Sequence, residues 1–238
     1  MHNEFANRVV VITGAAGNLG RAVAAAFAAK GARLAMLDLN EQGIQAVIDE
    51  LPTGSDARAY TVNLLESESV NQTMERVMAH FGRIDVLANI AGGFAMGPLI
   101  QDTEDAQWDF MMNLNARSVF YTCRAAIPNM LENGGGRIIN VSARAALEGK
   151  ARMGPYCASK AAVKTLTESL AAENKFDNIN VNCILPGTID TPQNREAMPE
   201  ANFNNWVPPA ALADVVVFLA SEAARCVTGA AIPVYGKS

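Results

Sequence analysis

The stretch RVVVITGAAGNLGRAVAAAF, residues 8–27, joins an apolar, β-branched run to a glycine-rich turn and a helical pattern. Gly14, Gly17 and Gly20 allow a tight turn in which backbone N–H groups approach an anion at the positive end of a helix dipole. Such glycine spacing also occurs in ordinary turns, so alone it is a weak indication. The strand-turn-helix order predicts the first unit of a parallel sheet, with a nucleotide site where the first strand ends.

The same alternation continues to the end of the chain. Short apolar runs predict strands near 8–13, 33–38, 57–62, 84–89, 137–142, 179–185 and 231–234. Stretches of helical period predict helices near 18–30, 40–51, 66–80, 103–132, 156–175 and 210–222. Because no repeat or Pro/Gly-rich linker divides the chain, we expect one α/β domain over 1–238, a Rossmann-type doubly wound parallel sheet with helices on both faces.

Composition and charge limit the partners. Half of the 238 residues are hydrophobic, and 19 basic residues stand against 24 acidic ones. This balance gives no electrostatic footprint for nucleic acid or for an anionic membrane, so we expect neither partner. Four cysteines without a C-x-x-C pair, together with two histidines, predict reduced thiols and no metal site. The first ten residues lack the pattern of a secretory leader and no apolar run is long enough to span a bilayer, so we expect a cytoplasmic protein.

Residues 187–209, GTIDTPQNREAMPEANFNNWVPP, form the longest segment without a clear period. A loop of this length in a single domain is usually a lid or a binding loop, and this one follows the carboxyl end of a predicted strand. We therefore predict a substrate lid in which Met198, Phe203 and Trp206 line a pocket. The alternative is that these side chains pin the loop to the body of the protein.

Asp38 ends the second predicted strand, 18 residues after Gly20. A carboxylate there can accept a hydrogen bond from the 2′-hydroxyl of an adenosine ribose and would repel a 2′-phosphate, which predicts NAD(H) rather than NADP(H) as cofactor. Arg21 and Arg33 are the nearby cations that would argue for a phosphate, but their positions favour a role at the surface. The small residues of NIAGG (89–93) leave room for the adenosine ribose, although a plain strand-to-loop turn has a similar sequence.

Tyr156 and Lys160 lie four residues apart in a predicted helix and so project from the same face. An ammonium close to a phenol stabilises the phenolate, so the pair predicts a Tyr156 pKa below the usual value of about 10 and a usable general acid/base. Taken alone, a tyrosine-lysine pair is typical of an amphipathic helix surface.

These features occur together with others in a fixed order: TGAAGNLG, Asp38, NIAG, Asn115 in NLNARSVF, Tyr156-x-x-x-Lys160, ILPGTIDT and TGAAIPV. The ordered set resembles the short-chain dehydrogenase/reductase family over nearly the whole chain. The resemblance implies an oxidoreductase that transfers a hydride between a nicotinamide and its substrate, with Tyr156 as acid/base. It also implies that Lys160 holds the nicotinamide ribose and that Asn115 positions a water connecting Lys160 to solvent. A homodimer or homotetramer, formed through the helices at 103–132 and 156–175, is implied as well.

The family pattern further implies which residues contact the cofactor. The set is Gly14, Gly17, Asn18, Leu19, Gly20, Asp38, Leu39, Asn63, Leu64, Asn89, Ala91, Gly92, Tyr156, Lys160, Pro186, Gly187, Ile189 and Thr191. Asn18 stands where a glycine is usual, with the glycine moved to 17, and Asn63 stands where the family often has an aspartate. The turn keeps three glycines and an asparagine amide still hydrogen-bonds, so both departures are compatible with NAD(H).

A third departure concerns the catalytic serine of the family. Aligned without gaps, GRIINVSA (136–143) places Ala143 at that position and Ser142 one residue before it. For a carbonyl that needs two donors, the loss of one typically costs about 10²–10³ in rate. Ser142 could replace it only through a one-residue shift of the strand, which would turn its side chain to the other face. Arg144 is a second candidate for the missing donor, with exposure to solvent as the alternative.

Three segments resemble one branch of the family, dihydropteridine reductase, which keeps the Tyr-x-x-x-Lys pair without the serine. They are AGGFAMG (91–97), ARAALEGKARMGPY (143–156) and DTPQNREAMPEANFNNW (190–206). This resemblance implies a quinonoid dihydropterin as substrate, a conjugated acceptor for which one proton donor suffices. The segment 212–236 instead resembles ordinary bacterial reductases. A general ketone or alcohol reductase of the 3-oxoacyl type, a non-catalytic nucleotide-binding sensor and a structural subunit of a tetramer remain as alternatives.

The predicted substrate pocket draws mainly on the segments of this narrower resemblance. Its candidate residues are Phe94, Met96, Ala143, Arg144, Met153, Asn194, Met198 and Trp206. For each of the loop residues, the alternative is that the side chain packs the loop.

Overall fold

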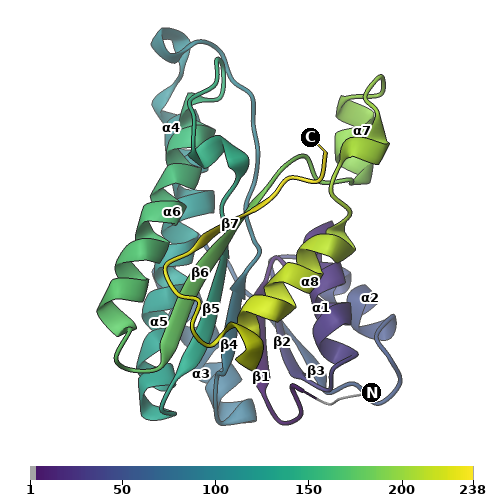
Figure 1. Cartoon of the computed structure of the whole chain (residues 1–238), viewed down its shortest axis with the longest axis vertical. Helices are drawn as coiled ribbons and strands as arrows, with labels where there is room; N and C mark the ends of the chain where they lie inside the picture. The colour runs from purple at the N-terminus through teal and green to yellow at the C-terminus, as the bar shows by residue number, and fades with distance from the viewer. Residues whose placement is uncertain (1–3, 238) are drawn as a thin grey trace.

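In residues 4–237, the part of the chain that the computed structural model describes, seven parallel strands form one sheet in the order β3-β2-β1-β4-β5-β6-β7 (Figure 1). The first three residues and Ser238 of the predicted domain lie outside the described residues. The strands are β1 (Val9–Thr13), β2 (Arg33–Asp38), β3 (Ala57–Thr61), β4 (Val86–Asn89), β5 (Gly136–Val141), β6 (Ile179–Pro186) and β7 (Ala231–Val234). The strand order reverses at β1, which lies between β2 and β4, and ligands of such sheets bind where the order reverses.

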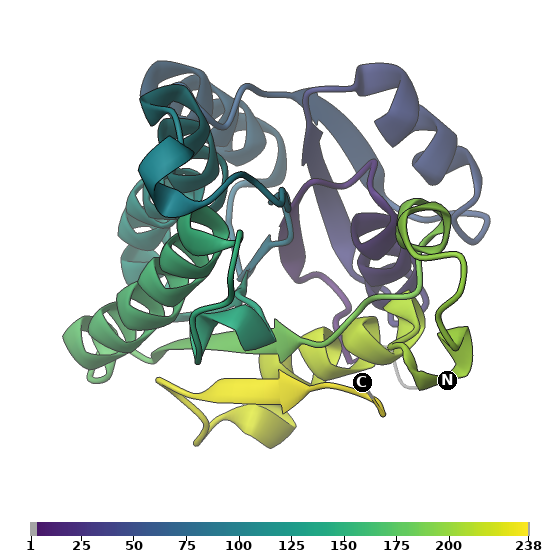
Figure 2. The same cartoon turned by 90° about the horizontal axis from the view of Figure 1, so that it is seen from above.

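Helices cover both faces of the sheet, as Figure 2 shows from above. They are α1 (Asn18–Ala28), α2 (Glu41–Asp49), α3 (Ser67–Phe81), α4 (Asp105–Met111), α5 (Ser118–Glu132), α6 (Gly154–Asn174), α7 (Pro192–Ala197) and α8 (Pro209–Ala220). Val10 and Ile12 of β1 pack toward α1, α2 and α8, whereas Val9 and Val11 pack toward α3, α5 and α6. Side chains of a strand alternate between its faces, so a strand buried on both faces is apolar throughout. The predicted fold class is therefore confirmed.

Two predicted segments differ in detail. The helix expected over 103–132 is interrupted between α4 and α5 by a π-helical segment, Met112–Arg117, in which Asn115 is buried. The segment 187–209, expected as a loop, contains the short helix α7 and a 3₁₀ turn at Phe203–Asn205. Six residues are too few for a helical period to show in the sequence. Among the described helices, none is both long and apolar enough to cross a bilayer.

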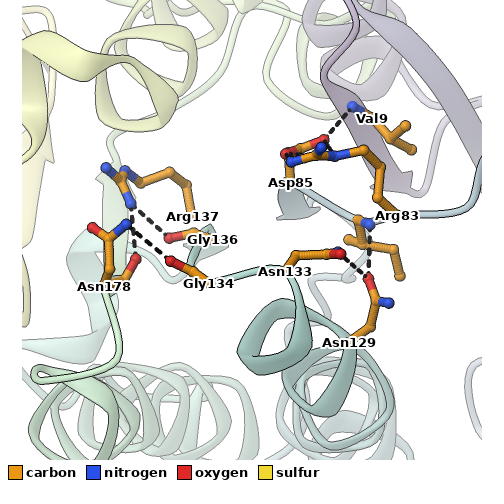
Figure 3. A network of polar contacts seen from close by, with 10 residues as sticks. Val9, Arg83, Asp85, Asn129, Asn133, Gly134, Gly136, Arg137 and Asn178 are labelled. Carbon is orange, nitrogen blue, oxygen red and sulfur yellow. Dashed lines mark hydrogen bonds and ion pairs between the residues drawn. The ribbon is translucent and has the colours of Figure 1, made fainter.

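Polar side chains tie the amino ends of the strands together (Figure 3). The Asp85 carboxylate accepts a hydrogen bond from the Val9 N–H at 2.8 Å and several from the guanidinium of Arg83. The Asn129 side chain, near the end of α5, accepts a hydrogen bond from the Ile84 N–H at 2.8 Å. Nearby, the Arg137 guanidinium donates to two backbone carbonyls at 2.9 and 3.1 Å. These contacts stabilise the end of the sheet at which the strands begin, opposite their carboxyl ends.

Candidate active site

The turn between β1 and α1 lies against the segment that follows β4. Gly14 has a φ of +65°, and a Cβ at this position would lie 2.8 Å from the Ala91 Cα. The Thr13 hydroxyl accepts hydrogen bonds from the N–H groups of Ile90 and Ala91, both at 3.1 Å. At Gly17, the N-cap of α1, no described side chain bonds the first N–H groups of the helix. Those N–H groups are thus available to an anion, as the predicted pyrophosphate contact requires.

The Asp38 carboxylate is held in place where β2 ends. One oxygen accepts from the Ala16 N–H in the glycine-rich turn at 3.1 Å, and the other accepts from the Asn40 N–H at 3.0 Å. Leu39, next to it, is 70% exposed. The carboxylate therefore belongs to the same local structure as the turn, where an adenosine ribose is predicted to bind.

Both cations that would favour a 2′-phosphate are paired with carboxylates. Arg21 forms an ion pair with Glu50, and Arg33 forms one with Asp56 at 2.7 Å. These pairs fit the surface role that the sequence favoured for both arginines.

Two predicted cofactor residues use their side chains within the protein. The Asn63 amide accepts from the Leu65 N–H at 3.1 Å and donates to Glu66 at 2.8 Å, inside its own turn. Asn89 is 2% exposed, and its amide bonds Asn140 at 2.9 Å between neighbouring strands. Only the backbone of Asn89 is therefore left for the predicted cofactor contact, because its side chain stabilises the interior of the sheet.

Three predicted residues meet around Gly92. A Cβ on Gly92 would lie 2.8 Å from the Asn115 side-chain oxygen and 3.1 Å from the Lys160 ammonium. The Asn115 amide donates to the Ser159 hydroxyl at 3.0 Å, and Ser159 donates to the Tyr156 carbonyl at 2.8 Å. Ser159 was not predicted, although its place three residues after Tyr156 puts it on the same side of α6. Asn115, Ser159 and the Tyr156-Lys160 turn thus form one hydrogen-bonded cluster.

Burial sets the proton affinities of the tyrosine-lysine pair. Lys160 is 5% exposed and donates to the Val141 carbonyl at 2.9 Å, and burial lowers its pKa to about 8. Burial raises the pKa of Tyr156 to about 12. The sequence predicted a lowered Tyr156 pKa, and that prediction is wrong for this structure because desolvation of the phenolate dominates. Tyr156 is consequently a protonated donor at neutral pH.

Ala143, not Ser142, packs on the side of Tyr156. Ala143 is buried together with Cys157 and packs against Tyr156 and Met153. The Ser142 hydroxyl is 2% exposed and donates to the Lys160 carbonyl at 2.7 Å. The one-residue shift that would let Ser142 replace the catalytic serine does not occur, because neighbouring residues of extended chain point to opposite faces.

Arg144 lies at the surface beside the C-terminal segment. Its guanidinium carbon is 5.2 Å from the centre of the Tyr235 ring. The side chain is therefore partly engaged by an aromatic ring, and its contact with a substrate stays a prediction.

One predicted pocket residue from the segment after β4, Phe94, lies against Tyr156. The Phe94 ring stands edge-on to the Tyr156 ring, with the ring centres 4.9 Å apart. Phe94 and Met96 are more than half exposed, and Met198 of the predicted lid is also exposed. Phe94 thus offers an apolar surface beside Tyr156, and contact of Met96 and Met198 with a substrate stays a prediction.

Other residues of the predicted lid hold the lid itself. Trp206 is buried, with its ring 4.8 Å from that of Phe203, and the Asn194 amide donates to the Ile189 carbonyl at 2.8 Å. Thr191 caps α7, and the Gly187 N–H donates to Val234. Trp206 and Asn194 thus pack the loop, and whether they also touch a substrate stays a prediction.

Comparison with known proteins gives matches over nearly the whole chain. The family model described as short chain dehydrogenase matches residues 8–202. D-threitol dehydrogenase of Mycolicibacterium smegmatis is 35% identical over 239 residues, which cover 96% of this chain and 92% of that protein. A 3-oxoacyl-(acyl-carrier-protein) reductase of Thermotoga maritima is 32% identical over 240 residues, 96% of each chain. The solved structure of an NAD⁺-bound xylitol dehydrogenase is similar with a TM-score of 0.90 and 28% identity, over 98% of this chain and 99% of that one.

Proposed function

Because this chain belongs to the short-chain dehydrogenase family, an oxidoreductase family that uses nicotinamide cofactors, we propose that it works with NAD(H) rather than NADP(H). The fixed Asp38 carboxylate supports this choice, since a 2′-phosphate beside it would be repelled. The pairing of Arg21 and Arg33 with carboxylates supports it as well. The N–H groups at the start of α1 would hold the pyrophosphate, and Lys160 would hold the nicotinamide ribose.

The proposed substrate is a conjugated acceptor such as a quinonoid dihydropterin. The observation that carries this proposal is Ala143, which packs against Tyr156 while the Ser142 hydroxyl is bonded to the Lys160 carbonyl. The family usually supplies two hydroxyl donors, a tyrosine and a serine. In this chain Tyr156 is then the one that is left. A ketone develops a localised alkoxide that benefits from two donors, whereas a conjugated ring spreads the incoming charge and needs one.

NADH, when bound, supplies the hydride. The chain supplies the proton and orients the group that donates it. Tyr156 donates its phenolic proton to the acceptor. The raised pKa of Tyr156 keeps the phenol protonated for this step. Asn115 and Ser159 hold the first turn of α6 and so fix the direction of the phenol. Phe94 stands beside the phenol and excludes water from it on that side.

Two alternatives make different predictions. A general ketone or alcohol reductase is favoured by the names of the relatives, one of which reduces a 3-oxoacyl group and one of which oxidises threitol. A non-catalytic nucleotide sensor would bind NADH without turnover, but such a protein has no chemical need for the cluster of Asn115, Tyr156 and Lys160.

We further propose a homo-oligomer, dimer or tetramer, that forms through α4, α5 and α6 in the cytoplasm. Phe110 on α4 and Phe120 and Leu131 on α5 are large apolar side chains that are 43 to 51% exposed, as an interface would require. The four cysteines are free, which fits a reducing compartment.

The test is oxidation of NADH by freshly generated quinonoid dihydropterin, run beside a panel of ketones and with NADPH as the control cofactor. Turnover of the pterin with NADH preferred over NADPH supports the proposal. Turnover of ketones alone would return the protein to the general reductases, and NADH binding without any turnover would favour the sensor.

A further inference from the structure

The predicted lid touches the glycine-rich turn through a contact between two residues that are 175 positions apart. The Asn18 side-chain amide donates to the Gln193 side-chain oxygen at 2.9 Å. Asn18 is the first residue of α1, and Gln193 is the second residue of α7, which lies beyond the carboxyl ends of the strands in Figure 1. Both side chains are exposed, so packing does not force them together.

Asn18 is the position at which this chain departs from the glycine of the family pattern. A glycine has no side chain and could not reach the lid, whereas the asparagine extends from the start of α1 and meets α7. The asparagine does not cap its own helix, because the N-cap is Gly17 and no described side chain bonds there. The Asn18 amide is therefore bonded to α7 and not within the turn.

Gln193 is carried by a lid that is internally tied. Asp190 and Arg195 form a two-bond ion pair at 2.6 and 2.8 Å, and Ile189 pairs with Val207 at the base of the lid. The C-terminal segment also holds the lid, since the Lys237 N–H donates to the Asn205 carbonyl at 3.0 Å. Because Asn18 and Gln193 lie on different elements, a displacement of α7 from α1 would break the contact between them.

We propose that Asn18 and Gln193 form a latch that holds the lid against the glycine-rich turn and slows the release of the bound dinucleotide. The two residues are positioning residues, which act through the lid and not on the reacting atoms. This inference rests on the proposed NAD(H) cofactor. A hydrogen bond between neutral side chains contributes a net free energy of about 0.5–1.5 kcal/mol. This corresponds to a change of about two- to tenfold in a rate or an equilibrium constant.

The experiment is a double-mutant cycle on the rate of NADH release, measured by stopped-flow fluorescence after mixing the NADH complex with excess NAD⁺. The variants are Asn18→Ala, Gln193→Met and the double variant, because methionine keeps the length of glutamine without its acceptor. Gln45→Met is the matched control, since Gln45 is an exposed glutamine that bonds Asp49 within α2. Thermal unfolding of each variant shows whether the fold is retained.

We expect each single variant to release NADH about two- to tenfold faster, with the double variant no faster than the faster single one and the control unchanged. The association rate of Gln193→Met should stay close to that of the unchanged protein, because Gln193 lies on α7, outside the glycine-rich turn. Unchanged release in both single variants would overturn the latch while leaving the cofactor proposal in place. Multiplicative effects in the double variant would also overturn it, since independent residues would then be responsible. Failure of the unchanged protein to bind NADH would overturn the cofactor proposal together with the latch.

Discussion

Arg83 and Lys160, which lie at opposite ends of the sheet, are two cations in opposite situations. At the amino end, the Arg83 guanidinium bonds the Asp85 carboxylate, and this hydrogen bond raises the pKa of Arg83. At the carboxyl end, burial lowers the pKa of Lys160 and raises that of Tyr156, so burial opposes the charged form of each. Pairing stabilises the fold, whereas a buried lysine with a backbone carbonyl as partner reduces stability. The difference leads us to expect that the Arg83–Asp85 pair contributes to stability and that Lys160, whose burial costs stability, serves the proposed chemistry.

The largest expected effect lies at the carboxyl end. Tyr156→Phe removes the proposed proton donor and keeps the ring that packs against Ala143 and Phe94. We expect kcat to fall by about 10²–10⁴-fold, while NADH binds with its affinity little changed. Steady-state kinetics and fluorescence titration measure the two quantities. A variant that keeps most of its turnover would remove Tyr156 from the mechanism.

Gly92→Ala tests how closely the proposed catalytic cluster of Asn115, Ser159, Tyr156 and Lys160 is packed. The added Cβ would lie 2.8 Å from the Asn115 side-chain oxygen and 3.1 Å from the Lys160 ammonium, so one of them must move. A displacement of this kind costs up to about 10²-fold in rate. Gly149→Ala is the matched control, because a Cβ there meets nothing within 4 Å. Equal activity in both variants would show that the cluster tolerates displacement.

Asp85→Ala tests the amino end. It removes the acceptor of the Val9 N–H and of Arg83, and we expect the free energy of unfolding to fall by about 1–3 kcal/mol. Turnover per folded molecule should stay the same, because the proposed active site lies at the other end of the strands. Urea unfolding and an assay of the folded fraction measure both. A loss of turnover that exceeds the loss of folded protein would contradict the division between the two ends.

The pH dependence of stability tests the burial of Lys160. The pKa of Lys160 is about 8 in the folded protein and near its ordinary value of 10.5 in the unfolded chain, so between these values the unfolded chain holds a proton that the folded protein lacks. Stability should therefore rise as the pH rises through this window. The free energy of unfolding, compared with that of Lys160→Met, should increase by about 2 kcal/mol from pH 8 to pH 10. Identical slopes for the two proteins would mean that Lys160 is not desolvated.

The fold and the position of Ala143 were both predictable from local patterns. Strands such as β1 are apolar on both faces, which predicts a sheet covered on both sides. The alternation of side chains in extended chain also predicted that Ser142 and Ala143 point in opposite directions. These inferences needed only neighbours in the sequence.

Other features depend on residues that are distant in the chain. The direction of the Tyr156 pKa shift follows from burial, which the spacing of Tyr156 and Lys160 does not reveal. The Asn89 amide turned out to bond Asn140, 51 residues away, and the π-helical segment around Asn115 has no periodic signal of its own. The roles of Ser159 and Gln193 likewise depend on tertiary contacts with Asn115 and Asn18.

The central claim is that Tyr156 acts as the only hydroxyl donor, because Ala143 stands where the family has a serine, and that this selects a conjugated acceptor. A ratio of specificities tests the claim most directly. The measurement is kcat/KM for quinonoid dihydropterin divided by kcat/KM for a simple ketone, with NADH, in the unchanged protein and in Ala143→Ser. We predict a ratio that favours the pterin in the unchanged protein and shifts about tenfold toward the ketone in the variant, less than the full value of a preorganised donor. A protein that prefers the ketone, with a ratio that the new serine leaves unchanged, would contradict the claim.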